Sequence, residues 1–327
     1  MRDRSIDILK GLAILFVYLG HSILYHPIPM QSMYVWCNQL AGFITSFNMP
    51  LFFFISGYLF AKTQKRTKES YKGKTKRILI PYITTMAILI GVKLFLPTSM
   101  SYNPATKGGI GSLIINALCY GGDRWFVYVL YVIFLFLIPL YKPLKNKPFA
   151  LGIVAGLIVI YFIGFLPEIF KLKEVFYYMI FFIVGFSING YYYRIKQWSL
   201  SHWSFLYFVF IVANLLFIQT LKNIPWVYHL ILPFSGSIAV ATMAFQLEKV
   251  TKNNTIIKYI EYCGKYSLQF YLLTFSYPII RVVIVSVLHV SNPILIILSV
   301  FMLQLVSTTI IVEITRRIKW LKIPFGY

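Results

Sequence analysis

The sequence predicts an all-α polytopic membrane protein with about ten transmembrane helices. Hydrophobic residues make up 59% of its 327 positions, and charged residues make up only 12%. The apolar residues form runs of about twenty, the length at which a helix crosses the ~30 Å hydrocarbon core of a bilayer. Because no internal repeat, low-complexity tract or soluble domain is visible, we expect residues 1–327 to form a single transmembrane domain.

The basic residues alternate between the connections, and this alternation predicts the orientation. The ten runs are residues 5–25, 43–62, 78–97, 125–141, 149–167, 174–190, 203–221, 228–247, 267–289 and 292–313. Of the 31 Lys and Arg residues, 23 fall at the two ends of the chain or after an even-numbered run. Five fall in the alternate connections, and three lie within runs. By the positive-inside rule, both termini are expected to be cytoplasmic.

The sequence disfavours two other interpretations, a nucleic-acid-binding protein and a cleaved signal peptide. The net charge of +22 does not indicate a nucleic-acid partner, because a nucleic-acid-binding protein gathers its basic residues on one soluble face. Residues 1–25 could instead be a cleaved signal peptide. However, Lys10 interrupts the apolar core that such a peptide needs, and no small-x-small cleavage site follows.

The first run carries a lysine and a histidine on one helical face. If the helix enters from the cytoplasm near Ser5, Lys10 lies ~8 Å along it and His21 ~24 Å along it. Eleven residues return to within ~20° of the starting direction, so the two side chains share a face. Ionisable groups within a span usually face a cavity or the interior of the bundle. The alternatives are that Lys10 only snorkels to the inner interface and that His21 only bonds a neighbouring helix.

Other runs place polar residues at matching depths. In the second run, Asn48 falls near the depth of the histidine, and Ser56 and Gly57 fall near the depth of the lysine. In the ninth, Arg281 lies ~21 Å from the cytoplasmic end, again near the histidine. Lys93, close to the end of the third run, is expected only to snorkel.

The outer side offers one candidate loop. The longest outer connection, residues 98–124, contains KGGIGS and ends in GGDRWF, so it is a candidate lid or acceptor-binding loop or an ordinary surface loop. The three cysteines, Cys37, Cys119 and Cys263, show no metal-ligand spacing, and no metal site is expected. Cys37 and Cys119 both fall on the outer side and could pair in an oxidising compartment.

These residues fit acyl transfer to a hydroxyl. A histidine in a water-poor site is the usual general base for taking the proton of an attacking hydroxyl. A coenzyme A thioester carries several phosphates, so its site should be a basic cluster facing the cytoplasm. The stretch KTQKRTKESYKGKTKRILIPY, residues 62–82, supplies such a cluster, in which Lys74 and Arg77 form the patterned pair. A basic cytoplasmic loop would also attract anionic lipid.

Four local patterns, in order along the chain, resemble the integral-membrane acyltransferase 3 family, bacterial enzymes that acylate cell-surface carbohydrates. The first run reads D-x-x-K-G-x-A-I-x(6)-H, with Asp7, Lys10 and His21 at the family's acid, basic and histidine positions. The second reads FNMPLFFFISGYLF, the third begins KTKRILIPY and the ninth begins GKYSLQFYLLTF. The start of the fourth, WFVYVLY at residues 125–131, is also similar to the family.

The resemblance implies a multi-pass protein of the bacterial cytoplasmic membrane. It implies that acetyl-coenzyme A, or another acyl-coenzyme A, is the co-substrate, with no bound cofactor. His21 would be the catalytic base, and Lys10, Lys74 and Arg77 would lie on the donor's path. The acceptor would be a hydroxyl of a cell-envelope or exported polysaccharide. The expected partners are therefore acyl-coenzyme A, a carbohydrate and membrane lipid, with a homodimer left open and no nucleic acid.

The remaining candidates are supporting residues. Asp7, one turn from the lysine of the first run, is expected to form an ion pair with it. Residues expected to line the pocket, with helix packing as the alternative, are Ser56, Gly57, Trp125, Ser267 and Tyr271.

Two residues depart from the family pattern. Asn48 and Thr274 stand where the family usually has histidine, and asparagine cannot exchange a proton at neutral pH. The alternative function is therefore export or flipping of a surface polysaccharide without acyl transfer. In that case Arg281, Asn48 and the tyrosines would line the translocation path.

Overall fold

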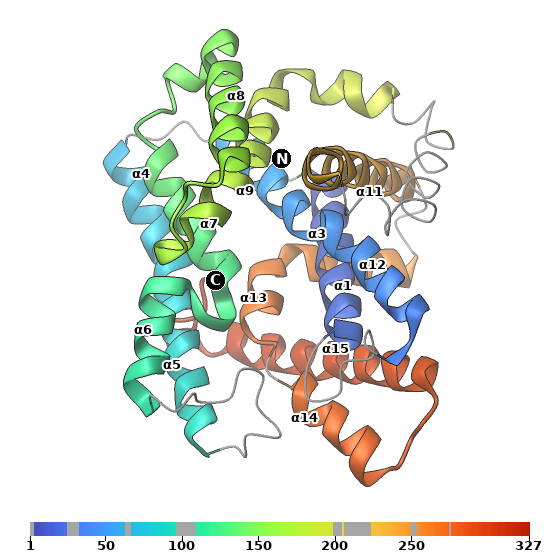
Figure 1. The fold of residues 1–327 in the computed structure, drawn as a ribbon. Coiled ribbons are helices and arrows are strands. Elements are labelled where there is room, and N and C mark those ends of the chain that lie inside the picture. Colours follow the sequence, from blue (N-terminus) through green and yellow to red (C-terminus); the bar gives the residue numbers. More distant parts are fainter. Residues whose placement is uncertain are drawn as a thin grey trace.

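The computed structural model describes residues 3–24, 33–62, 67–95, 109–198, 205, 224–249, 254–274 and 276–327. Within these ranges every regular element is a helix, as the composition predicted, and no strand occurs. In Figure 1, α4, α5 and α6 lie on one side of the molecule, α1 and α3 lie towards the other, and α15 runs across the lower part. The main helices are α1 (Arg4–Leu24), α3 (Val35–Ala61), α4 (Thr67–Lys74), α5 (Ile80–Phe95), α6 (Gly109–Tyr120), α7 (Trp125–Leu137), α8 (Lys147–Ile163), α9 (Leu172–Ile188), α11 (Leu232–Lys249), α12 (Thr255–Lys265), α13 (Ser267–Leu272), α14 (Tyr277–Val282) and α15 (Pro293–Arg317).

Six helical segments of the described chain are long and apolar enough to cross a membrane. They are Arg4–Leu24, Val35–Ala61, Thr67–Phe95, Gly109–Leu137, Val227–Lys249 and Pro293–Arg317. The predicted runs at 149–167 and 174–190 correspond to α8 and α9, each of 17 residues. The run at 203–221 lies outside the described residues, apart from position 205. The protein is thus a multi-pass membrane protein, while the count of about ten spans and the cytoplasmic termini stay predictions.

The predicted span at 267–289 is wrong as a single helix. α13 ends at Leu272, and a separate helix, α14, begins at Tyr277 and continues into the π-helical turn η8 (Val283–Val287). Pro278 lies in the first turn of α14, where proline favours a helix start but would interrupt a continuing one. The break leaves backbone carbonyls at the end of α13 without partners from the next helical turn.

The predicted outer loop at 98–124 is partly helical, because α6 occupies Gly109–Tyr120 and the short helix η3 (Gly122–Arg124) follows it. Residues 96–108 lie outside the described part of the chain. Cys37 and Cys119 are both free thiols, so the pairing considered from the sequence is wrong.

Close helix packing surrounds α3. A Cβ atom on Gly57 would lie 1.8 Å from the carbonyl oxygen of Phe182, and one on Gly185 would lie 2.0 Å from that of Phe54. The two glycines therefore let the backbones of α3 and α9 touch, as small residues do between membrane helices. Of the two roles predicted for Gly57, pocket lining and helix packing, the structure favours helix packing, because the absence of a side chain is needed at this contact.

Candidate active site

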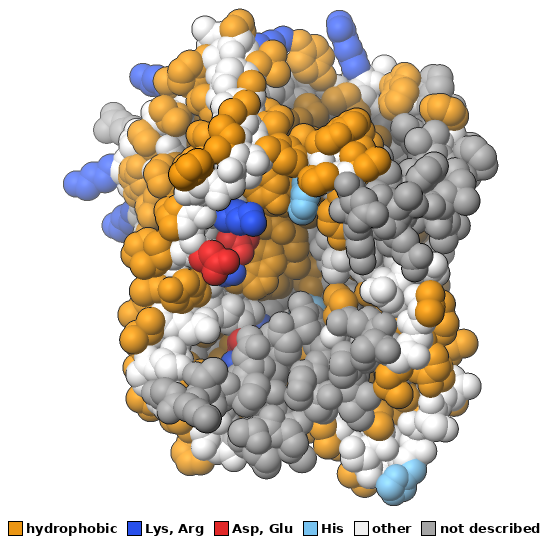
Figure 2. Space-filling view, in the orientation of Figure 1, with side chains coloured by type: hydrophobic (Ala, Val, Ile, Leu, Met, Phe, Trp, Pro, Cys, Tyr) orange, Lys and Arg blue, Asp and Glu red, His pale blue; other side chains and the backbone are white. Residues whose placement is uncertain are grey.

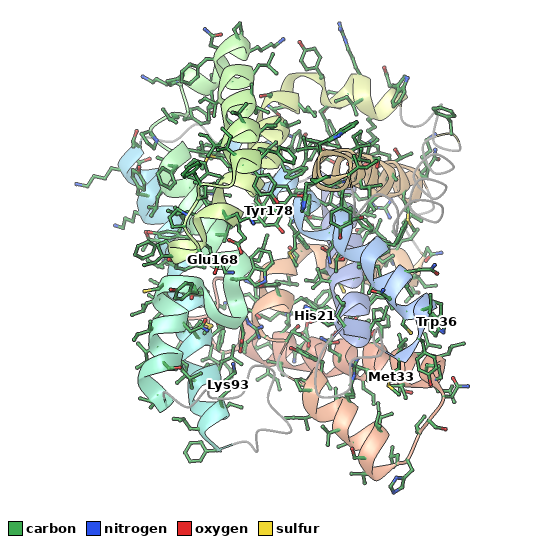
Figure 3. All side chains as sticks on the ribbon, viewed as in Figure 1. His21, Met33, Trp36, Lys93, Glu168 and Tyr178 are labelled. Atoms are coloured by element: carbon green, nitrogen blue, oxygen red, sulfur yellow. The ribbon has the colours of Figure 1, made fainter. Side chains whose placement is uncertain are left out.

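His21 lies near the C-terminal end of α1 and lines a cavity of about 550 Å³, here called the outer cavity after the orientation predicted from the sequence. Figure 2 shows this face of the molecule hollowed, with acidic and basic side chains beside the hollow. In Figure 3, His21, Lys93 and Tyr178, from α1, α5 and α9, lie around the same opening. The other polar and aromatic lining residues are Thr45, Asn48, Asn116, Tyr120, Asp123, Arg124, Trp125, Lys171, Tyr271, Thr274 and Tyr277.

The two positions that depart from the family pattern both line this cavity. The side-chain oxygen of Asn48 accepts a hydrogen bond from the backbone N–H of Met49 at 2.7 Å. The hydroxyl of Thr274 donates to the hydroxyl of Tyr18 at 2.5 Å. The departures therefore change the surroundings of His21 itself, not a distant part of the bundle.

A second cavity, of about 740 Å³ and here called the inner cavity, surrounds the predicted donor-binding residues. Lys10, Ser56, Lys74, Arg77 and Ser267 all line it. Three further cations that the sequence analysis had counted only as loop residues also line it: Lys265, Arg316 and Lys322. Among the described residues, the lining thus carries six cations and no Asp or Glu side chain, although Asp7 pairs with Lys10 and Glu313 pairs with Arg316. This excess of positive charge suits a ligand bearing several phosphates.

Two of these cations lie at an irregularity in the helix. Lys74 and Arg77 lie at the junction of α4 with the π-helical turn η1 (Thr75–Leu79), an irregularity that often occurs at functional sites. The ammonium of Lys74 lies 3.7 Å from the ring centroid of Phe134. Lys10 forms the ion pair with Asp7 that the spacing predicted, at 2.9 Å.

The two cavities meet at Tyr271. This side chain of α13 is 7% exposed and belongs to the lining of both cavities. Ser267, one turn earlier in the chain, lines the inner cavity, and Thr274 lines the outer one. α13 therefore follows the boundary between the cation-lined space and the space beside His21.

Arg281 supports the end of α1 and is not among the residues that line the outer cavity. Its side chain is fully buried, and its guanidinium donates to the carbonyl oxygens of Ser22 and, at 3.4 Å, of His21. The carbonyls at a helix C-terminus carry partial negative charge, which a cation stabilises. The guanidinium thus fixes the turn of α1 that presents the histidine.

Lys93 does not simply snorkel, as the sequence analysis expected. Its ammonium forms an ion pair with Asp123 at 2.5 Å, and the two side chains are 10% and 9% exposed. Both residues line the outer cavity. Such a desolvated pair is stable only when both partners are present.

Trp125, a predicted pocket residue, forms part of an aromatic wall of the outer cavity. Its ring centroid lies 5.6 Å from that of Tyr178, which in turn stacks on Phe53 at 4.4 Å. Rigid aromatic faces beside amide and hydroxyl groups suit an acceptor that has both apolar and polar surfaces.

Sequence reasoning missed Arg124, which had been assigned to an outer loop. The residue is 6% exposed and lines the outer cavity. The sequence held one signal for this residue: in the GGDRWF segment, Arg124 directly precedes the Trp-Phe pair that is similar to the family. Among the described residues, no three His, Cys, Asp or Glu side chains are grouped so as to hold a metal ion.

Comparisons with known proteins give two matches. A family model described as an acyltransferase domain matches residues 3–313, nearly the whole chain. The chain is also 35% identical over 95 residues to Nodulation protein NolL of Sinorhizobium fredii. That alignment covers 28% of this chain and only 26% of the relative. No solved structure matches significantly.

Proposed function

The chain belongs to the integral-membrane acyltransferase 3 family, and from this premise we propose that it is an O-acyltransferase acting across the bacterial cytoplasmic membrane. It would move an acetyl or other short acyl group from cytoplasmic acyl-coenzyme A to a hydroxyl of a cell-envelope or exported polysaccharide. The observation that carries the proposal is the pair of cavities, one lined by cations and one by His21, that meet at Tyr271.

The inner cavity supports the choice of donor. Lysine and arginine are the side chains that bind phosphate, arginine through a planar fork and lysine as a compact charge. The cavity brings Lys10, Lys74 and Arg77 together with the three further cations. Acyl-coenzyme A would place its phosphates here and extend the thioester along α13 toward Tyr271.

His21 supplies the chemistry in this proposal. The imidazole takes the proton of the acceptor hydroxyl, whose oxygen attacks the thioester carbonyl carbon. The tetrahedral intermediate then collapses, the carbon–sulfur bond breaks and the coenzyme A thiolate takes up the proton from the imidazolium. The acceptor would enter through the outer cavity, where Trp125, Tyr178 and the polar groups around them offer both stacking surfaces and hydrogen bonds.

The proposal is tested by the ester content of the surface polysaccharide. A deletion strain would carry the intact protein, the His21→Ala variant or the control variant His289→Asn. His289 is an exposed histidine in the left-handed region, a backbone conformation that asparagine tolerates. We expect His21→Ala to abolish the ester at normal protein and polymer amounts, while the control keeps it. Polymer that is missing from the surface in the deletion strain and is restored by both variants would indicate the exporter instead.

A further inference from the structure

Arg124 occupies a specific place between the two cavities. Its guanidinium carbon lies 5.8 Å from the ring centroid of Tyr271, the residue that both cavities share. Both Arg124 and His21 line the outer cavity. The guanidinium therefore lies beside the boundary that a thioester must reach, in the lining of the cavity that holds the proposed base.

The break between α13 and α14 holds this guanidinium in place. Nε of Arg124 donates to the carbonyl oxygen of Leu272 at 3.2 Å, and Nη2 donates to that of Thr274 at 2.8 Å. These are carbonyls that the interrupted helix leaves for other donors. Nη1 also donates to the carbonyl oxygen of Asp123, at 3.5 Å. Several contacts on one planar group fix its orientation, which a flexible lysine ammonium in this position would not achieve.

We propose that Arg124 is a catalytic residue that stabilises the oxyanion formed from the thioester carbonyl during acyl transfer. The inference rests on the proposed function. When the acceptor oxygen attacks the carbonyl carbon, the C=O π electrons move to the oxygen, and the hydroxyl proton goes to His21. A fixed cation in a water-poor site interacts more strongly with that new charge than with the neutral ground state. Collapse of the intermediate re-forms the C=O bond and expels the thiolate.

The test measures the steady-state kinetics of the full chain in lipid nanodiscs, with acetyl-coenzyme A as donor and extracted polysaccharide as acceptor. We expect Arg124→Gln to lower kcat by about 100- to 1000-fold, the usual cost of removing one oxyanion donor. The KM and Kd for acetyl-coenzyme A should change by less than about threefold, because the interaction develops only in the transition state. Lys173→Gln removes an exposed cation outside the cavity lining on the same predicted side, and should keep the wild-type rate.

Chemical rescue separates this role from a merely structural one. Arg124→Ala should regain part of its kcat when guanidinium ion is added far below denaturing concentrations, and an equal concentration of sodium should have no effect. An Arg124→Gln variant with unchanged kcat, beside an inactive His21→Ala, would overturn the inference and leave the proposed function standing. A loss that guanidinium does not restore, together with a lower melting temperature, would make Arg124 a structural brace of the helix break and would also overturn it. A wild-type protein that transfers no acyl group would overturn both proposals.

Discussion

Lys265 and Lys258 form a matched pair for testing whether the inner cavity binds acyl-coenzyme A. Both lysines are exposed and lie on α12, seven residues apart, but only Lys265 lines the inner cavity. Its ammonium lies 5.3 Å from the ring centroid of Tyr266, another lining residue. Substitution of either lysine by glutamine removes one positive charge from α12. The two variants therefore lower the net positive charge of this helix by the same amount.

The expected effect follows from the exposure of Lys265. A hydrogen bond to a charged group contributes about 1.5–3 kcal/mol when it is well formed. Water and salt screen an exposed ammonium, so we take ~1.4 kcal/mol, which is about tenfold in affinity. Lys265→Gln should therefore weaken acetyl-coenzyme A binding about tenfold, and Lys258→Gln less than about twofold.

The assay is isothermal titration of the purified protein with acetyl-coenzyme A at two salt concentrations. The loss caused by Lys265→Gln should shrink at high salt, because screening already weakens the contact in the wild-type protein. Equal losses in the two variants would refute the reasoning, since they would trace binding to the charge of the whole helix and not to the cavity.

Three further variants test helix packing, the buried ion pair and the end of α1. Gly57→Ala should lower the free energy of unfolding by about 1–3 kcal/mol because its Cβ overlaps α9, and Gly156→Ala, with open space around it, should not. Lys93→Met should lower the free energy of unfolding by about 3 kcal/mol, because it leaves Asp123 without this partner. Adding Asp123→Leu should restore much of the lost stability. A double variant less stable than Lys93→Met would contradict this. Arg281→Met should lower kcat by loosening the turn that carries the histidine, and a variant with wild-type kcat and stability would show that the carbonyl contacts do not matter.

Hydrophobic run length predicted much of the fold. α1 and α5 occur where the apolar runs at 5–25 and 78–97 predicted them, because run length and the 3.6-residue repeat depend on local sequence alone. α4, which carries Lys74, is a polar helix that no apolar run predicted. The ion pair between Asp7 and Lys10 likewise follows from a one-turn spacing. The break after Leu272 did not follow, because hydropathy records composition and does not record where the backbone leaves the helical path.

Residues whose roles depend on tertiary packing were the ones missed. Arg124 and Lys265 were both counted as loop cations. The folded helices bring Arg124 into the lining of the outer cavity and Lys265 into that of the inner cavity. Gly57 carried two interpretations, cavity lining and helix contact, which the sequence could not separate because both favour a small residue. The position of an apolar run in the chain does not say which helix will lie against it.

In the proposed function, an acyl group passes directly from a donor on the inner side to an acceptor on the outer side, with His21 as the general base. The most direct measurement loads sealed right-side-out membrane vesicles with labelled acetyl-coenzyme A, supplies polysaccharide only outside, and follows label in the external polymer. We expect ester formation by the wild-type protein, none when the donor is supplied only outside, and none with His21→Ala. Transfer by His21→Ala at the wild-type rate, or transfer only when donor and acceptor are on the same side, would contradict it.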